Sequence, residues 1–344
     1  MNRFAGAVQR SVYGEPFASL RGEPNSRIRR CLSVAFWAVL SIALLALLVL
    51  KLGISLDDLA VAVRSTPAWL IATILASTFL IQVITSYRWK IAIDWLSPGA
   101  SRIRFLDLLK ATTWGTVLGQ VLPLQVSLSL GRWWSVRDGR GRWVVGTTLY
   151  EQMFDLIVLC AGAIGAVLAI SLAASPMLAL AVFAVALAGG SLAVRHLFAL
   201  GHWIALRLGR GGGLGAKIAA KVTSPLAAAK DAPTQVLFLL SAASVGKLLL
   251  LVLRPVAVAA VLAPAARSWT VAVGYPLVGL AVANPLMPGG LGVAEWSWTG
   301  LLALAGSAAA AAGVAAIVLR ILNLAALGAV MVAVVALDRL RHSV

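Results

Sequence analysis

The stretch "ANPLMPGGLGVAEW", residues 283–296, interrupts a region that is otherwise apolar enough to cross a membrane. It holds the polar Asn284, two prolines, three glycines and the carboxylate of Glu295. Proline and glycine destabilise helices, and polar groups are costly in hydrocarbon. Unwound backbone is tolerated at membrane depth only where protein or a water-filled cavity surrounds it. The stretch therefore predicts a broken helix that lies against a polar interior.

The composition is typical of a helical membrane protein. Hydrophobic residues make up 61% of the 344 residues and charged residues only 12%, and the mean hydropathy is +0.94. Long apolar runs, among them 32–50 and 235–262, have the length of membrane-spanning helices, whereas barrel strands would alternate. We therefore predict an all-α polytopic membrane protein. The excess of basic residues does not indicate nucleic-acid binding, because it follows the loops.

The basic residues predict which helix ends face the cytoplasm. Of the 29 Lys and Arg residues, 23 lie in the two terminal tails and in the segments 88–110, 132–142 and 195–230. The positive-inside rule places these segments, and hence both termini, on the cytoplasmic side. The predicted crossings are 32–50, 67–87, 143–171, 177–194, 235–262 and 311–336.

This topology gives one transmembrane domain, 32–337, between a basic cytoplasmic tail, 1–31, and a second tail, 338–344. Inside the domain, 195–234 mixes Leu, Phe and Trp with basic residues. That mixture is typical of a helix that lies along an anionic membrane surface. We expect this segment to be a cytoplasmic interfacial linker.

Two segments do not fit as full crossings. Residues 111–130 have basic loops at both ends and contain breakers such as Pro123, which predicts a re-entrant hairpin from the cytoplasmic side. Residues 269–306 must leave from and return to the outer side. Their legs, of about 15 residues or roughly 22 Å, are shorter than the ~30 Å hydrocarbon core. We expect six crossings and two opposed broken hairpins, with eight full crossings as the alternative.

Several charged or polar residues lie inside the apolar runs. Glu151 and Asp155 are four residues apart and share a helix face, as do Arg320 and Asn323. Lys247 lies deep in its own predicted span. Because each buried charge is costly in a bilayer, these groups must face one another or water. They form either structural ion pairs or a polar cavity that accepts a charged group.

Further basic residues are predicted at the cytoplasmic rim. Arg88 and Lys90 flank Trp89 at the end of the second predicted span, and Arg132 precedes two more tryptophans. Such groups are either ordinary interfacial anchors or the residues that gather a lipid headgroup. Gln120 belongs to the interrupted segment 111–130, which precedes Arg132.

The order of these motifs resembles the lysylphosphatidylglycerol synthase transmembrane, or flippase-like, domain family, over about residues 30 to 337. The motifs are "RWK" (88–90), "GQVLPLQVSLSLGRWW" (119–134), "YEQMFDL" (150–156), "PLMPGGLGVAEW" (285–296) and Arg320. The resemblance implies a lipid-translocating domain of a bacterial cytoplasmic membrane. The sequence has no soluble aminoacyl-transferase domain, so we expect no lipid synthesis.

We therefore expect translocation of an amphiphilic, anionic lipid, either a phospholipid or a polyprenyl-phosphate-linked glycolipid, and an interior in which opposed half-helix ends meet. One alternative is an intramembrane glycosyltransferase that uses Asp57 and Asp58, although Ser55 before them also reads as a helix cap. Another is a scaffold for a lipid-modifying enzyme or glycosyltransferase.

We expect the lipid to be the main partner, with no catalytic residue, metal or cofactor. Cys31 and Cys160 are too few for a disulfide framework or a metal site. The expected substrate-binding residues are Arg88, Lys90, Gln120, Pro123, Arg132, Glu151, Asp155, Lys247, Asn284, Pro288, Gly289, Gly290, Gly292, Glu295, Arg320 and Asn323.

Overall fold

The computed structural model describes most of the chain after its first 38 residues. The described ranges are 39–96, 103–120, 122, 124–135, 141–171, 176–210, 226–227, 229–283 and 288–342. The chain divides into two compact units, Met1–Leu40 and Ser41–Val344, and the contacts below all lie in the second. Every regular element within the described ranges is a helix, as expected.

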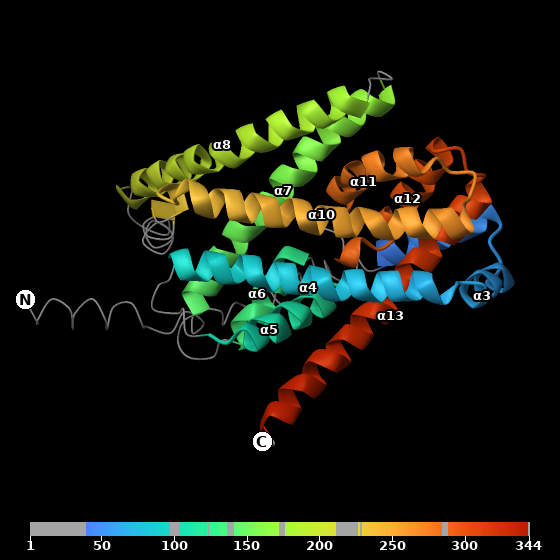
Figure 1. Cartoon of the computed structure of the whole chain (residues 1–344), viewed down its shortest axis with the longest axis horizontal. Coiled ribbons are helices and arrows are strands. Elements are labelled where there is room, and N and C mark those ends of the chain that lie inside the picture. Colours follow the sequence, from blue (N-terminus) through green and yellow to red (C-terminus); the bar gives the residue numbers. More distant parts are fainter. Residues whose placement is uncertain are drawn as a thin grey trace, which may run out of the picture. The chain divides into compact units, whose positions relative to one another are not determined.

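Long apolar helices dominate this second unit (Figure 1). Among the described residues, five are long and apolar enough to cross a membrane: α4 (Ala68–Leu96), α7 (Gly141–Ser171), α8 (Pro176–Arg210), α10 (Thr234–Leu262) and α13 (Ala309–His342). A sixth candidate is the helix Val39–Leu52 together with α3 (Leu56–Arg64), which follows it at a bend of 91°. The protein is thus a multi-pass helical membrane protein.

Two pairs of short helices form antiparallel hairpins. The first hairpin is α5 (Phe105–Leu118) and α6 (Leu124–Ser135). The second is α11 (Ser268–Val282) and α12 (Val293–Leu304), with the one-turn helix η3 (Pro288–Gly290) at its tip. These four helices have 14, 12, 15 and 12 residues. At helical rise they reach roughly 18–22 Å, which is shorter than the ~30 Å hydrocarbon core.

The two hairpins pack against opposite ends of α4. Leu108 and Ala111 of the first hairpin lie in one apolar cluster with Trp89 and Ile93. The second hairpin packs against the beginning of α4, in a separate cluster that contains Leu70, Ile74, Val271, Leu301 and Leu302. The two hairpins therefore contact the helix bundle at opposite ends of α4.

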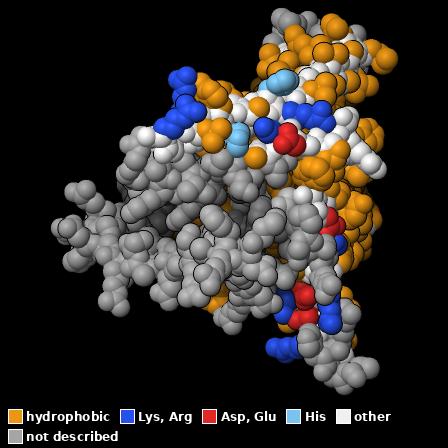
Figure 2. Space-filling view, turned by 90° about the vertical axis from the view of Figure 1, so that its left-hand side faces the viewer, with side chains coloured by type: hydrophobic (Ala, Val, Ile, Leu, Met, Phe, Trp, Pro, Cys, Tyr) orange, Lys and Arg blue, Asp and Glu red, His pale blue; other side chains and the backbone are white. Residues whose placement is uncertain are grey.

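The helix ends that we assigned to the cytoplasm meet at one end of the unit. The last turns of α4 share an apolar cluster with the first turns of α10 and the middle of α8. Lys110 at the start of α5 pairs with Asp338 near the end of α13. In Figure 2, which looks onto this end, Lys, Arg and His side chains gather beside the hydrophobic flank. This grouping agrees with the predicted sidedness.

Three helix boundaries differ from the prediction. Helix α4 continues to Leu96 instead of ending near 87, so Arg88 and Lys90 lie within it. Helix α8 continues unbroken to Arg210, so 195–210 is not a separate helix. The first hairpin runs from 105 to 135 instead of 111–130. In each case, the helix continues through the basic and aromatic residues that mark a membrane boundary. These residues do not break a helix, and no proline follows at the predicted boundary.

Candidate functional site

The tips of the two hairpins touch at Gly289. Its φ of 55° lies in the left-handed region that favours glycine. A Cβ at this position would lie 2.7 Å from the backbone oxygen of Gln120 at the tip of the first hairpin. Only glycine therefore fits here without displacing one tip from the other. The dense breakers of the opening stretch allow this backbone-to-backbone contact.

Glu295 lies in the first turn of α12, beside this contact. Its Oε2 accepts a 2.6 Å hydrogen bond from the amide of Gly292, which caps the helix, and its side chain is 2% exposed. A carboxylate in the first turn also suits the helix dipole. The other oxygen, Oε1, has no hydrogen-bond partner among the described residues. Helix α12 starts at Val293, directly after the glycines of this stretch.

Arg320 of α13 joins the tip to the last long helix. Its Nη1 donates a 2.9 Å hydrogen bond to the carbonyl oxygen of Gly289. The same nitrogen lies 3.7 Å from Glu295 Oε1, which is an ion pair without a direct hydrogen bond. Arg320 Nε has no hydrogen-bond partner within the described part of the chain. This pair of opposite charges is loosely held.

A partly open pocket of about 310 Å³ lies beside this pair. Its polar lining comes from both hairpins and from α13, and its apolar lining includes Leu45 of the first described helix. The lining residues are Leu45, Gln120, Leu291, Glu295, Ile317, Arg320, Ile321 and Leu324. We call this the tip pocket. Its lining includes a cation and a carboxylate, and each has one buried atom without a hydrogen-bond partner among the described residues.

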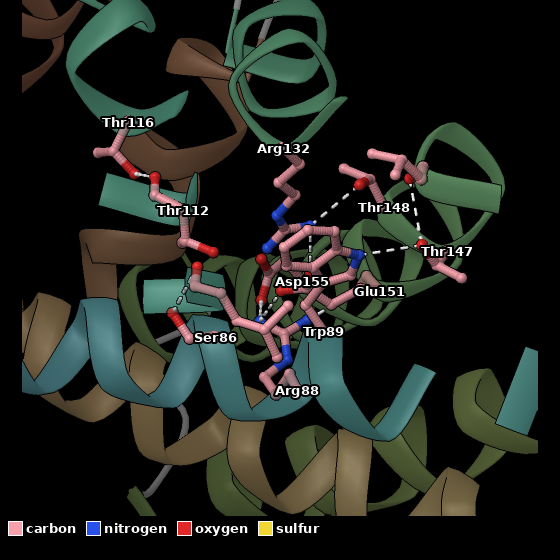
Figure 3. A network of polar contacts seen from close by, with 12 residues as sticks. Ser86, Arg88, Trp89, Thr112, Thr116, Arg132, Thr147, Thr148, Glu151 and Asp155 are labelled. Atoms are coloured by element: carbon pink, nitrogen blue, oxygen red, sulfur yellow. Dashed lines mark hydrogen bonds and ion pairs between the residues drawn. The ribbon is translucent and has the colours of Figure 1, made fainter. Parts of the chain in front are cut away.

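A second charged cluster lies where Arg88, Arg132, Glu151 and Asp155 meet (Figure 3), and it also includes Lys247. Arg88 of α4 contacts Asp155 of α7 at 2.6 Å and donates from Nη2 to the backbone oxygen of Glu151, also at 2.6 Å. Arg132 of α6 pairs with Glu151 at 2.6 Å. Lys247 of α10 pairs with Asp155 at 2.7 Å. We call these five residues the inner network. The name refers to Arg88, which lies eight residues from the end of α4 that the charge pattern assigns to the cytoplasm.

Aromatic and hydroxyl groups fix Arg132 in this network. The guanidinium carbon lies 4.4 Å from the centre of the Trp89 ring, a cation–π contact. The Trp89 indole donates to Thr147 at 2.9 Å, which orients the ring. Arg132 Nη1 also donates to Thr148 at 3.1 Å. Sequence reasoning missed both threonines, because only their spacing of four and three residues from Glu151 connects them with it.

The expected substrate-binding residues separate into groups. Arg88 and Arg132 are 0% exposed, so their expected position at an open rim was wrong: opposite charges on α7 draw both inward. Lys90 remains partly exposed and pairs with Asp94. Pro288 starts η3, and Gly290 and Gly292 have the positive φ of this tip. Pro123 and Asn284 lie outside the described residues.

Asn323 belongs to a third polar group. Its Oδ1 accepts from Arg254 Nη1 at 3.3 Å, and Arg254 Nε donates to Ser77 at 3.0 Å. Asn323 therefore lies apart from the Glu295 contacts of Arg320, although both are on α13. Lys247 and Arg254 are seven residues apart, which puts them on one face of α10, but this spacing does not indicate Asn323 as the partner of Arg254.

Ser55 and Asp58 form a reciprocal helix cap. The Asp58 amide donates to the Ser55 hydroxyl at 3.1 Å, and Asp58 Oδ2 accepts from the Ser55 amide at 2.9 Å. The capping role expected for Ser55 is confirmed. This geometry accounts for Asp58 without catalysis.

The fold and these sites define a polytopic helical membrane protein with two broken hairpins around a charged interior. The model of one family, the lysylphosphatidylglycerol synthase TM region, matches residues 36–330. The chain belongs to this family, which confirms the resemblance of its motifs. Searches of curated proteins and of solved structures gave no significant match.

Proposed function

We propose that this protein moves an amphiphilic, anionic lipid between the leaflets of the bacterial cytoplasmic membrane. The observation that carries the proposal is the contact of two opposed broken hairpins at a charged pocket. Opposed interrupted helices are a recognised construction for a transport site near the membrane midplane. Such a site is open to both sides in turn when one hairpin moves relative to the other.

The tip pocket has the size and chemistry for a headgroup. Its volume of about 310 Å³ lies at the lower end of ligand pockets, so it admits a headgroup while acyl chains stay in the surrounding lipid. Arg320 supplies a cation and the unused donor Nε for a phosphate oxygen. Glu295 Oε1 accepts a hydrogen bond from a headgroup hydroxyl or ammonium.

The inner network extends this polar path toward the cytoplasmic side. It brings five buried or half-buried charges to the face of α7 that also contacts the first hairpin. Lys90 lies nearer the predicted membrane surface, where it attracts anionic headgroups. In this proposal, a headgroup passes from the surface to the network and then to the tip pocket.

Glu295→Gln and Arg320→Ala test the proposal in liposomes that contain purified protein and a fluorescently labelled phosphatidylglycerol. We expect either variant to reduce lipid movement to less than about a tenth of the wild-type rate, because each removes a charge-assisted contact of about 1.5–3 kcal/mol. Both should remain folded. Lipid movement at the wild-type rate in both variants would contradict the site.

The double variant Asp57→Asn with Asp58→Asn is the control. It also distinguishes a translocator from the glycosyltransferase alternative, which would use these two carboxylates. A translocator should keep its rate, since Asp57 and Asp58 lie on α3, away from the tip pocket lining. Loss of activity in this variant, with normal rates for Glu295→Gln, would favour the glycosyltransferase alternative.

A further inference from the structure

The inner network carries one more positive than negative charge. Among the described residues it contains three cations, Arg88, Arg132 and Lys247, and two carboxylates, Glu151 and Asp155. The side chains of Arg88, Arg132 and Glu151 are at most 1% exposed, whereas those of Lys247 and Asp155 are 17% and 26% exposed and pair with each other. A buried charge needs a counter-charge, because water does not reach it. The network is therefore one negative charge short of neutral.

The same network has unused hydrogen-bond donors. Nε and Nη2 of Arg132, and Nε of Arg88, have no hydrogen-bond partner in the described part of the chain. Nε and Nη2 form one edge of the Arg132 guanidinium, while Nη1 on the other side contacts Glu151 and Thr148. Such an edge offers two parallel N–H groups, the arrangement that binds two oxygens of one phosphate.

We propose that the inner network is a binding site for the phosphate of a lipid that carries a single phosphodiester. The phosphate would accept two hydrogen bonds from Nε and Nη2 of Arg132, and its single negative charge would neutralise the network. This inference rests on the proposed function, because it names the class of lipid that the protein moves. It adds a second headgroup site, on the cytoplasmic side of the tip pocket.

The charge balance sets the selectivity of this site. A phosphodiester carries one negative charge, whereas a terminal phosphomonoester carries about 1.5 to 2 at neutral pH. A monoester or diphosphate would leave the buried network negative. The site therefore favours phosphodiesters, such as phosphatidylglycerol or a sugar joined to a polyprenyl chain through one phosphate, over phosphatidic acid and polyprenyl diphosphates.

Arg132 is held ready for this role. The Trp89 ring covers one face of the guanidinium at 4.4 Å, and the ion pair with Glu151 fixes its other end. A donor edge that is already oriented loses little rotamer entropy on binding. The site is closed in this conformation, since Arg132 is 0% exposed, and α6 must move away from α7 to admit a headgroup.

Native mass spectrometry of full-length protein released from nanodiscs tests the site. The nanodiscs contain phosphatidylcholine with equal small fractions of phosphatidylglycerol and phosphatidic acid. We expect wild-type protein to retain phosphatidylglycerol about tenfold more often than phosphatidic acid. Arg132→Gln should lose this preference, because it removes both the charge and the two-donor edge, whereas Arg132→Lys, which keeps the charge without the edge, should retain less of both lipids but keep the preference. Equal retention of the two lipids by wild-type protein would overturn the proposal.

Glu151→Gln provides the sharper test, because it adds one positive charge to the network without changing its shape. Its preference should shift toward phosphatidic acid. Arg254→Gln is the matched control, since Arg254 is an arginine in the same bundle but outside the network, and it should keep the wild-type preference. An unchanged preference in Glu151→Gln, or the same shift in Arg254→Gln, would contradict the charge balance. Melting temperatures of all variants identify any that do not fold.

A water-soluble phosphodiester distinguishes binding of a lipid from binding of a free phosphate compound. Phosphatidylglycerol in detergent should raise the melting temperature of the protein, while dimethyl phosphate, a diester without acyl chains, should not. Equal stabilisation by both would overturn the assignment to a lipid. If wild-type protein retains phosphatidylglycerol through Arg132 but moves no lipid, the proposed function fails and the site stands. If Arg132→Gln moves and retains lipids like wild type, the site fails and the function stands.

Discussion

The inner network and the tip pocket use similar residues in different ways. In the network, Asp155 lies 2.6 Å from Arg88 and 2.7 Å from Lys247, and most of the charged groups are fully buried. In the tip pocket, Arg320 and Glu295 are 3.7 Å apart beside a glycine turn and an open volume. Tight pairing joins helices α4, α6, α7 and α10 in the network, whereas the pair at the tip pocket is loose.

This comparison predicts how strongly each region contributes to stability. Removing one member of a tightly paired buried cluster leaves its partners uncompensated and destabilises the fold. Removing a member of a loose pair beside a pocket changes the folded state little, but it removes a group that a ligand would use. We therefore expect variants of the inner network to lower the melting temperature more than variants of the tip pocket, while variants of either region impair lipid movement.

The largest effect on stability is expected from Asp155→Asn. It leaves Arg88 and Lys247 without the carboxylate that both contact, and breaking a buried pair costs about 3–5 kcal/mol. Thermal unfolding in detergent, followed by tryptophan fluorescence, measures this loss. Asp94→Asn is the matched control, because Asp94 is 43% exposed and its surface pair with Lys90 contributes little. Similar melting temperatures for the two variants would remove the distinction between network and surface pairs.

An intermediate effect on stability is expected from Gly289→Ala. The positive φ of Gly289 costs a residue with a Cβ about 1–2 kcal/mol, and the new Cβ meets the Gln120 carbonyl oxygen. We expect a modest loss of stability but a severe loss of lipid movement, because the added Cβ pushes the two hairpin tips apart. Gly300→Ala is the control, since no atom lies within 4 Å of its Cβ position. Normal transport by Gly289→Ala would show that the tip contact is dispensable.

The smallest effect is expected from Trp89→Phe. Phenylalanine keeps a ring over Arg132 but loses the indole hydrogen bond to Thr147. A single neutral hydrogen bond contributes about 1 kcal/mol, so the melting temperature should fall less than in Asp155→Asn. A loss as large as that of Asp155→Asn would mean that the ring, and not the ion pairs, holds the inner network.

Local features of the hairpins could be predicted from the sequence. The glycines and prolines of 283–296 predicted a break there, and α12 begins at Val293 within this stretch. The cap at Ser55 was equally local. Such features depend on residues a few positions apart, so the chemistry of each short stretch determines them.

Contacts between distant helices could not be predicted. Glu151 and Asp155 were expected to share a face, but nothing in the sequence pairs them with Arg132 of α6 or Lys247 of α10. Such contacts depend on how each helix is rotated and shifted relative to its neighbours. The length of α8 was also missed, because a basic segment marks a membrane surface without ending a helix.

The central claim, that the two hairpins meet at a pocket through which a headgroup passes, is tested most directly by linking the hairpins. Gln120→Cys and Leu291→Cys, in a background with Cys31→Ala and Cys160→Ala, place one thiol on each side of the tip pocket. A short bis-methanethiosulfonate reagent should join them within one chain and stop lipid movement, which a reductant should restore. Failure to link the two cysteines, or wild-type lipid movement by the linked protein, would contradict the account.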